Sequence, residues 1–107
     1  MIKLQYKVWH KIDKEMYWGA EKYTEGKWNL AKLMNNKHVV VLYSIDKKDL
    51  NNVETYVFDI VQYNNMYYYV SDMINGAVDL IGLNVDETIP IRDLEYTIIG
   101  NLYELNS

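Results

Sequence analysis

The sequence has 107 residues, of which half are apolar and 24% are charged, and its formal net charge is −4. This length suits a single domain over residues 1–107, and the composition is that of a folded chain and excludes a disordered one. Cysteine is absent and no apolar run is long enough to cross a bilayer, so we expect a cytoplasmic protein without disulfides, thiolate metal sites or a membrane segment.

The first third of the chain predicts two short strands and one helix. Apolar and polar residues alternate from Ile2 to Trp9, which predicts a half-buried strand with Lys3, Lys7 and Trp9 on one shared face. The polar residues 11–15 predict a turn, and residues 16–18 predict a second strand. Residues 27–35 have apolar spacings near the helical period and predict a short helix.

Further along the chain, apolar and β-branched runs predict five more strands. They cover residues 38–45, 55–63, 66–71, 77–85 and 96–105. The polar residues 46–52 predict a loop, and a kink or turn is expected near Asp59. Pro90 limits its own run to an edge strand or a loop, and Gly100-Asn101 predicts a bulge. The fold class is therefore α+β and mainly β: a small SH3-like barrel or curled antiparallel sheet with one short helix.

The pair Asn64-Asn65 predicts a two-residue hairpin turn, because Asn tolerates positive φ better than most residues. This turn would place Tyr63 opposite Met66 and Val61 near Tyr68. A second tight turn is predicted at Asn75-Gly76.

Three consecutive tyrosines follow the hairpin turn. In a strand, Tyr67 and Tyr69 share one face and Tyr68 occupies the other. A stacking surface for nucleic-acid bases would thus contain two of these rings at most. Cross-strand packing and a protein interface are the other two interpretations that the pattern allows.

The sequence contains no recognisable catalytic motif. His10 and His38 have no carboxylate or cysteine at metal-ligand spacing, and there is no nucleophile elbow or phosphate-binding glycine loop. Asp59 is enclosed by apolar residues, and we interpret it as a turn or bulge aspartate that bonds backbone N–H groups. We therefore expect no enzyme activity, no cofactor and no metal.

Charge is distributed unevenly along the chain. Residues 1–50 contain ten lysines and six acids, whereas residues 51–107 contain one arginine and nine acids. This asymmetry predicts a bipolar surface if the two halves stay apart in space, and a largely cancelled field if they intermix.

Three segments resemble, in this order, parts of the YopX family of small phage and prophage proteins. They are IKLQYKVWHKIDKEMYW (residues 2–18), LYSIDKKDLNNVETYVFDIVQY (residues 42–63) and YTIIGNLYE (residues 96–104). The closing segment is similar to the family's Ile-Gly-Asn-Ile-Tyr-Glu and is the most specific of the three. The chain departs from the family pattern at His10, where Asp is usual, at Ser44-Ile45, which replaces Thr-Gly, and at Phe58, where a Gly precedes Asp-Ile-Val. The resemblance implies a barrel-containing α+β fold and an origin in a phage or mobile element, and it supplies no catalytic residues.

The first functional hypothesis is a non-enzymatic accessory protein that binds a bacterial host protein in the host cytoplasm, as an inhibitor of a defence system (anti-CRISPR-like or another anti-defence protein). The acidic second half of the chain would steer it toward a basic partner, such as a nucleic-acid-handling or defence protein. The predicted partner-binding residues are Tyr67, Tyr69, Asp72, Asp79, Asp86 and Glu87.

Two alternatives stay open. The first is a protein that binds RNA or DNA through the Lys- and Trp-rich N-terminal half. Its predicted contact residues are Lys3, Lys7, Trp9, Lys11, Lys14 and Trp18. The second is a homo-oligomer whose edge strands pair between copies.

Overall fold

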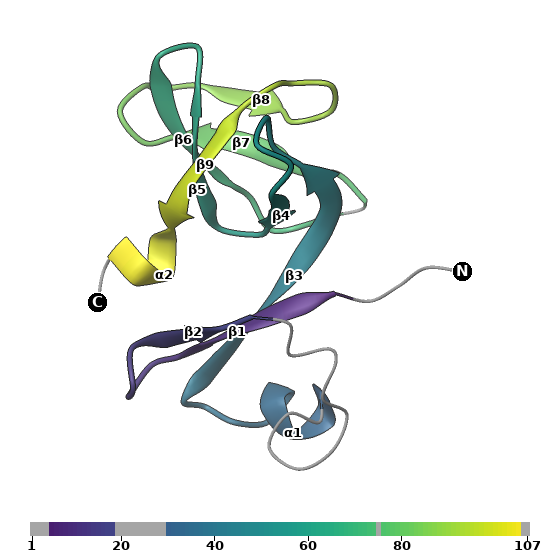
Figure 1. The fold of residues 1–107 in the computed structure, drawn as a ribbon, viewed down its shortest axis with the longest axis vertical. Helices are drawn as coiled ribbons and strands as arrows, with labels where there is room; N and C mark the ends of the chain where they lie inside the picture. The colour runs from purple at the N-terminus through teal and green to yellow at the C-terminus, as the bar shows by residue number, and fades with distance from the viewer. Residues whose placement is uncertain (1–4, 19–29, 75, 106–107) are drawn as a thin grey trace.

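A computed structural model describes residues 5–18, 30–74 and 76–105 of the chain. These residues form two lobes, as Figure 1 shows. The N-terminal lobe, as we define it, contains β1 (Tyr6–His10), β2 (Glu15–Tyr17), α1 (Leu30–Met34) and the first half of β3 (Val39–Lys48). The C-terminal lobe contains the second half of β3 and then β4 (Glu54–Tyr56), β5 (Asp59–Tyr63), β6 (Met66–Val70), β7 (Asp79–Gly82), β8 (Thr88–Pro90), β9 (Thr97–Asn101) and α2 (Leu102–Leu105).

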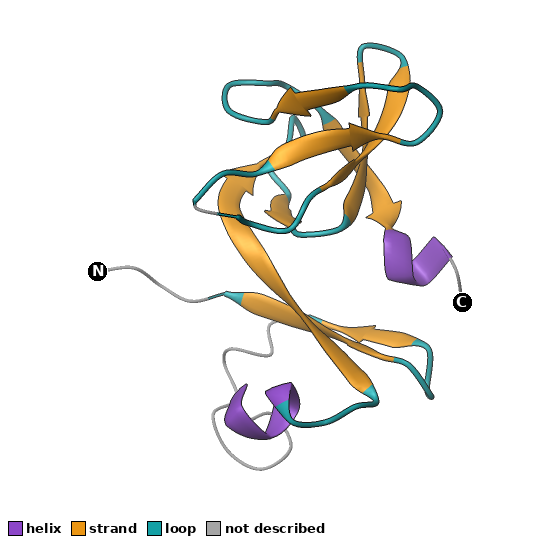
Figure 2. Cartoon of the chain, turned by 180° about the vertical axis from the view of Figure 1, so that it is seen from behind, coloured by secondary structure: helices purple, strands orange, loops and turns teal. Residues whose placement is uncertain are grey.

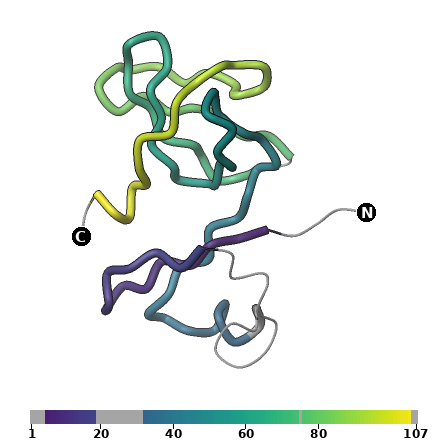
Figure 3. The backbone as a smooth tube through the Cα atoms, viewed as in Figure 1, coloured from purple at the N-terminus to yellow at the C-terminus, as the bar shows by residue number. Residues whose placement is uncertain are grey.

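The strands form two antiparallel sheets. One has four strands in the order β2-β1-β3-β4, and the other has five in the order β8-β7-β6-β5-β9. β3 contributes to both lobes, because Val39 to Tyr43 pair with β1 whereas Ser44 and Lys48 pair with β4. Figure 3 shows its trace running from one lobe into the other, and Figure 2 shows the five-stranded sheet curling beside its far end. The predicted mainly β, α+β fold with a curled antiparallel sheet is confirmed.

The hairpin at Asn64-Asn65 has the predicted register. Both asparagines have positive φ, 52° and 63°, as the two central residues of a type I′ turn require. Tyr63 pairs with Met66, and the third pair from the turn joins Val61 to Tyr68. The turn therefore fixes which tyrosine side chains point to the core side of the sheet and which point to its opposite side.

The core of the C-terminal lobe lies under the concave side of the five-stranded sheet. Its buried members are Val61, Tyr68, Val70, Leu80, Ile91 and Tyr96. The hydroxyl groups of Tyr96 and Thr55 are hydrogen-bonded at 2.6 Å, which ties β4 to the segment before β9. Burial raises the pKa of Tyr96 to about 12, so this phenol stays protonated at alkaline pH values at which an exposed tyrosine ionises.

Strand β1 is covered on both faces, in contrast to the half-buried strand that its alternating sequence predicts. Tyr6 and Val8 pack with Leu33 of α1 on one face. On the other face, Trp9 packs with Leu42 of β3 and with the turn that follows β4. The second face is buried because the C-terminal lobe contacts it, a neighbour that strand periodicity does not reveal.

The chain after β9 also differs from the prediction. The strand predicted over residues 96–105 ends at Asn101, where the short helix α2 begins. The Asn101 Oδ1 atom accepts the N–H of Tyr103 at 3.0 Å, as a helix N-cap does. The bulge predicted nearby is present, because Ile98 and Gly100 pair with consecutive residues of β5 and the residue between them has no opposite.

The loop after β3 is held against β9 by a buried acid, Asp49. Its Oδ1 atom accepts the N–H groups of Asn51 and Val53, and its Oδ2 atom accepts the N–H of Ile98, each at 2.9 Å. The polar composition of this loop predicts a solvated segment. Asp49 instead fastens the loop to the edge strand of the five-stranded sheet.

Gly82 is required at the end of β7, where the following loop turns back. Its N–H donates to the carbonyl oxygen of Glu87 at 2.8 Å, and a Cβ at this position would collide with the carbonyl oxygen of Val85.

Gly82→Ala should lower the free energy of unfolding by about 2–3 kcal/mol, the cost of forcing an atom into packed backbone. A Cβ at Gly100 meets no atom within 4 Å, so Gly100→Ala should stay within about 0.5 kcal/mol of the wild type. Urea unfolding measures both, and equal losses would contradict the prediction.

Asp49 predicts an acid-dependent part of the stability. Burial by itself would raise the pKa of Asp49, but its three backbone N–H donors outweigh burial and hold the pKa below its usual value. A carboxylate with a lowered folded-state pKa stabilises the fold above its unfolded-state pKa, and this stabilisation is lost as the pH falls through the folded-state pKa. Asp49→Asn should therefore cost about 1–3 kcal/mol at neutral pH, and the difference from the wild type should shrink below about pH 4.

Urea unfolding at several pH values checks this prediction. The matched control is Asp46→Asn, because Asp46 is an exposed acid three residues earlier. The free energy of unfolding of Asp49→Asn is compared with that of the wild type at each pH. A difference that stays constant from neutral to acidic pH would show that the hydrogen-bonded carboxylate is not its source.

Candidate protein-binding face

The convex side of the five-stranded sheet presents aromatic and aliphatic side chains. Because Tyr68 points into the core, its neighbours Tyr67 and Tyr69 point to the convex side. Tyr69 pairs with Ile81 of β7, and Leu83 donates its N–H to the carbonyl oxygen of Tyr67 at 2.9 Å. Tyr67, Tyr69, Ile81 and Leu83 thus adjoin one another, and we call them the outer face.

The outer face is open to solvent at one end. Tyr67 is 42% exposed and Leu83 is 44% exposed, while Tyr69 and Ile81 are half-buried. The backbone of Tyr67 is fixed by the Asn84 Oδ1 atom, which accepts its N–H at 3.1 Å. The predicted pairing of Tyr67 and Tyr69 on one face is confirmed. The two aliphatic members come from β7 and the residue after it, and only the register between β6 and β7 could have identified them.

Two of the predicted acids lie at one end of the outer face. Asp79 precedes Ile81 by two positions in β7, so strand alternation places it on the same side. Asp72 is exposed just after β6, where its Oδ1 atom accepts the N–H of Met73 at 2.9 Å.

The other two predicted acids, Asp86 and Glu87, are exposed in the loop after β7, at the opposite end. Glu87 is turned toward the core side, because its Oε1 atom lies 3.4 Å from the Tyr68 hydroxyl, which donates to it. Burial and the Glu87 carboxylate raise the pKa of Tyr68. Glu87 therefore anchors the loop, and the acids of the prediction do not form one patch.

The uneven charge of the sequence is also uneven in space. Among the described residues, the N-terminal lobe has five lysines and two acids, and residues 45–105 form the C-terminal lobe (Figure 1). Residues 45–105 carry eleven acids and only three basic residues, Lys47, Lys48 and Arg92. The interpretation in which the two halves intermix is therefore wrong, and the outer face belongs to an acidic lobe.

The residues predicted for a nucleic-acid interface do not share an exposed surface. Lys7 is 1% exposed and Trp9 is 5% exposed, so neither can contact a phosphate or a base. Their assignment is wrong because both faces of β1 are covered. Lys3 lies outside the described residues.

The remaining members of that prediction lie near the β1–β2 hairpin. Lys11 and Lys14 are exposed in its turn. Trp18 is 56% exposed, but its ring lies over a buried lysine side chain, with the Lys7 Nζ atom 4.0 Å from the ring centroid. Trp18 thus has a structural contact of its own.

Lys7 is bound to the C-terminal lobe. Its Nζ atom donates to the Asp59 Oδ1 atom at 2.9 Å, and both side chains are 1% exposed. The ammonium group also lies 4.7 Å from the ring centroid of the buried Tyr56, which makes a cation–π contact. Burial lowers the pKa of Lys7, and the Asp59 carboxylate opposes this shift.

Asp59 has two further partners. Its Oδ2 atom accepts the backbone N–H of Tyr56 at 2.8 Å, and the Asn101 side-chain amide donates to its Oδ1 atom at 2.9 Å. The prediction of a turn aspartate that bonds a backbone N–H is confirmed. Its ion pair with Lys7 is new, since the two residues are 52 positions apart and nothing in the sequence pattern joins them.

The histidines have ordinary surroundings. The His10 Nδ1 atom accepts the N–H of Asp13 at 3.1 Å, and His38 is exposed before β3. Within residues 5–18, 30–74 and 76–105, no three His, Cys, Asp or Glu side chains lie close enough together to hold a metal ion. Over the same part of the chain, no helix has the length and apolar character needed to cross a membrane.

No protein-family model and no curated protein matches this chain. Among solved structures, it is similar to the crystal structure of protein EF1440 from Enterococcus faecalis, with a TM-score of 0.68 and 16% sequence identity. The similarity covers 100% of this chain and 98% of that one. At this identity the match shows a shared fold, and the family of the chain stays a prediction.

Removing the Lys7 ammonium tests the ion pair. Lys7→Met keeps most of the side-chain volume but leaves the Asp59 carboxylate buried with two neutral donors, and we expect a loss of about 3–5 kcal/mol in the free energy of unfolding. Lys11→Met is the control, because Lys11 is exposed in the next turn. Urea unfolding measures both variants. A loss below about 1 kcal/mol for Lys7→Met would mean that the pair contributes no more than a surface ion pair.

Proposed function

We propose that this chain is a non-enzymatic accessory protein of a phage or mobile element that binds a bacterial host protein through the outer face. The proposed consequence is inhibition of a host defence protein or of another nucleic-acid-handling protein in the host cytoplasm. The proposal includes no catalytic step, cofactor or metal ion.

The observation that carries the proposal is the outer face itself. Tyr67 and Leu83 are large apolar side chains held side by side on a rigid sheet, and more than 40% of each is in contact with water. Contiguous apolar surface rimmed by polar residues marks interaction sites in soluble proteins. Tyrosine is also over-represented among residues that dominate binding energy, because a rigid ring contributes much contact area at little entropic cost.

The charge of the C-terminal lobe supports the choice of partner. A lobe with eleven acids and three basic residues repels nucleic acid and attracts basic surfaces. Proteins that handle nucleic acid carry such basic surfaces, and complementary charge raises the rate at which the two proteins meet. The phage or mobile-element origin rests on the resemblance of the three sequence segments to the YopX family.

Capture from bacterial lysate tests the proposal. The tagged protein is incubated with host lysate with and without nuclease, and bound protein and nucleic acid are both quantified. We expect a stoichiometric host protein that survives nuclease and is lost from a Tyr67→Ser/Leu83→Ser variant. Titration with the purified partner should then show binding weakened more than about tenfold, as expected for truncated hot-spot residues.

The matched control is Ile12→Ser/Leu105→Ser, which removes two exposed apolar side chains that lie outside the outer face. This variant should bind as the wild type does. Retention of the partner by Tyr67→Ser/Leu83→Ser, or recovery of nucleic acid alone, would overturn the proposal.

A further inference from the structure

The convex side of the five-stranded sheet continues beyond the outer face, across β5 to the edge strand β9. Ile81 pairs with Tyr69, and Tyr69 pairs with Ile60. Ile60, which is buried, pairs in turn with Gly100 of β9. Residues that pair directly across strands lie on the same side of a sheet. These four residues therefore form one row that begins in the outer face and crosses four strands.

A bulge in β9 adds an exposed apolar side chain at the end of this row. Ile98 packs against the core of the lobe, so strand alternation turns Ile99 to the convex side, where it is 52% exposed. Gly100 leaves an open space beside it, because a Cβ at this position would meet no atom within 4 Å. Bulges re-aim side chains beside functional sites in many sheets. The β9 end of the convex side therefore offers an apolar anchor next to a notch.

The charge of the convex side has one sign. None of the five strands, whose residues are all described, contains a lysine, an arginine or a histidine. Asp79 is the acid that alternation places on this side. The surrounding lobe, residues 45–105, carries eleven acids and three basic residues. A partner rich in lysine or arginine would thus be attracted and would meet no like charge on the strands.

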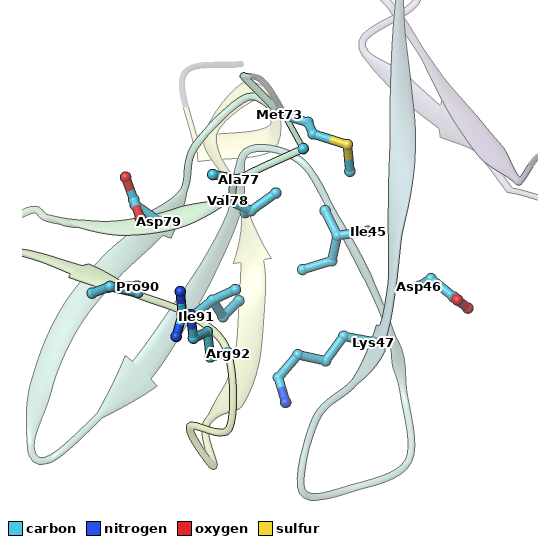
Figure 4. Close-up of a pocket in the computed structure, with 11 residues that line it drawn as sticks. Ile45, Asp46, Lys47, Met73, Ala77, Val78, Asp79, Pro90, Ile91 and Arg92 are labelled. Carbon is cyan, nitrogen blue, oxygen red and sulfur yellow. The ribbon is translucent and has the colours of Figure 1, made fainter.

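The opposite side of the sheet has a groove whose charges are mixed. This groove has a volume of about 540 Å³ and lies between β3 and the β7–β8 end of the sheet. Figure 4 shows its apolar residues Ile45, Val78 and Ile91. Its lining also contains two basic residues and two acids, which are Lys47, Arg92, Asp46 and Asp79. The groove therefore favours no ligand of one charge, whereas the convex side favours a basic one.

We infer that the convex side binds a short amphipathic α-helix of the partner, with an apolar stripe flanked by lysine or arginine residues. The face of a sheet offers side chains only, because the backbone groups of its inner strands are paired with one another. A helix satisfies its own backbone groups, whereas an extended peptide on this face would leave N–H and C=O groups against apolar side chains. This inference rests on the proposed function, because it identifies the element of the partner that the outer face binds.

The size of the convex side suits such a helix. The order β7-β6-β5-β9 separates Leu83 from Ile99 by three strand spacings, about 14 Å, which is the length of roughly ten helical residues. Apolar residues recur every three or four positions along an amphipathic helix. The stripe would lie on Tyr67 and Leu83 at one end and on Ile99 and the notch at Gly100 at the other. Burial of this stripe supplies most of the binding free energy.

Fluorescence anisotropy with a labelled peptide tests the inference. The peptide has about 18 residues, enough to form a helix, with leucine at helical spacings and lysine elsewhere. We expect saturable binding that weakens as salt is added. Ile99→Ser should weaken binding about fivefold, and Gly100→Lys, which fills the notch with a cation, about tenfold. The matched controls are Ile12→Ser and Ile12→Lys, because Ile12 is 64% exposed on the N-terminal lobe, and both should stay within about twofold of the wild type.

Two further measurements test the helix itself. A peptide of the same composition, scrambled so that its leucines form no stripe, should bind about tenfold more weakly. Circular dichroism should show that the striped peptide gains helix on binding and that every variant stays folded. No saturable binding, equal binding of the scrambled peptide, no gain of helix, or unchanged affinity in Ile99→Ser and Gly100→Lys would each overturn the inference.

Capture of the host partner separates this inference from the proposed function. Loss of that partner from Tyr67→Ser/Leu83→Ser, together with any of the contrary peptide results, would leave the proposed function standing and refute the helix. Retention of the partner by Tyr67→Ser/Leu83→Ser would instead overturn the proposed function, and the inference with it.

Discussion

The buried pair of Lys7 and Asp59 is the interaction on which the arrangement of the two lobes depends. Lys7 comes from β1 of the N-terminal lobe, and Asp59 begins β5 of the C-terminal lobe. Burying two charges costs free energy that their attraction recovers only if every donor and acceptor is satisfied. Here the carboxylate also binds the Tyr56 N–H and the Asn101 amide, so one acid joins β1, the β4–β5 turn and the end of β9. A displaced lobe would leave these groups buried without partners, and the pair therefore favours one relative position.

The same pair explains why an unusual residue is tolerated beside it. Phe58 has a positive φ of 66°, a conformation that costs a bulky residue roughly 1–2 kcal/mol and that glycine adopts freely. In this chain the ring of Phe58 packs edge-on against Tyr103 at 5.9 Å between centroids. The next residue, Asp59, accepts the backbone N–H of Tyr56 and the side-chain amide of Asn101. Packing and hydrogen bonds therefore offset the backbone strain, and the turn keeps its shape.

The sequence was sufficient wherever local chemistry determines structure. Asn64-Asn65 predicted the hairpin and its register, and the register predicted that Tyr67 and Tyr69 share a face. The sequence was insufficient wherever a segment far away in the chain determines the environment of a residue. Lys7 was predicted to be exposed because the alternation of apolar and polar residues describes β1 alone. It contains no information about the lobe that covers this strand. Helix α2 was missed although Asn101 is a favourable N-cap residue, because the apolar run before it extends through the same residues and favours a strand. The structural role of Asp49 was missed because one of its hydrogen-bond partners, Ile98, is 49 positions away in the chain.

The outer face and the groove lined by Ile45, Val78 and Ile91 lie on opposite sides of β7, and this separation follows from strand alternation. Ile81 points to the outer face, whereas Leu80 points to the core and Val78 to the floor of the groove. A change at Tyr67 or Leu83 therefore leaves the groove unaltered, and a change at Lys47 or Arg92 leaves the outer face unaltered. Their charged residues differ as well, because the outer face adjoins acids whereas the groove is lined by two basic residues, Lys47 and Arg92, and two acids, Asp46 and Asp79.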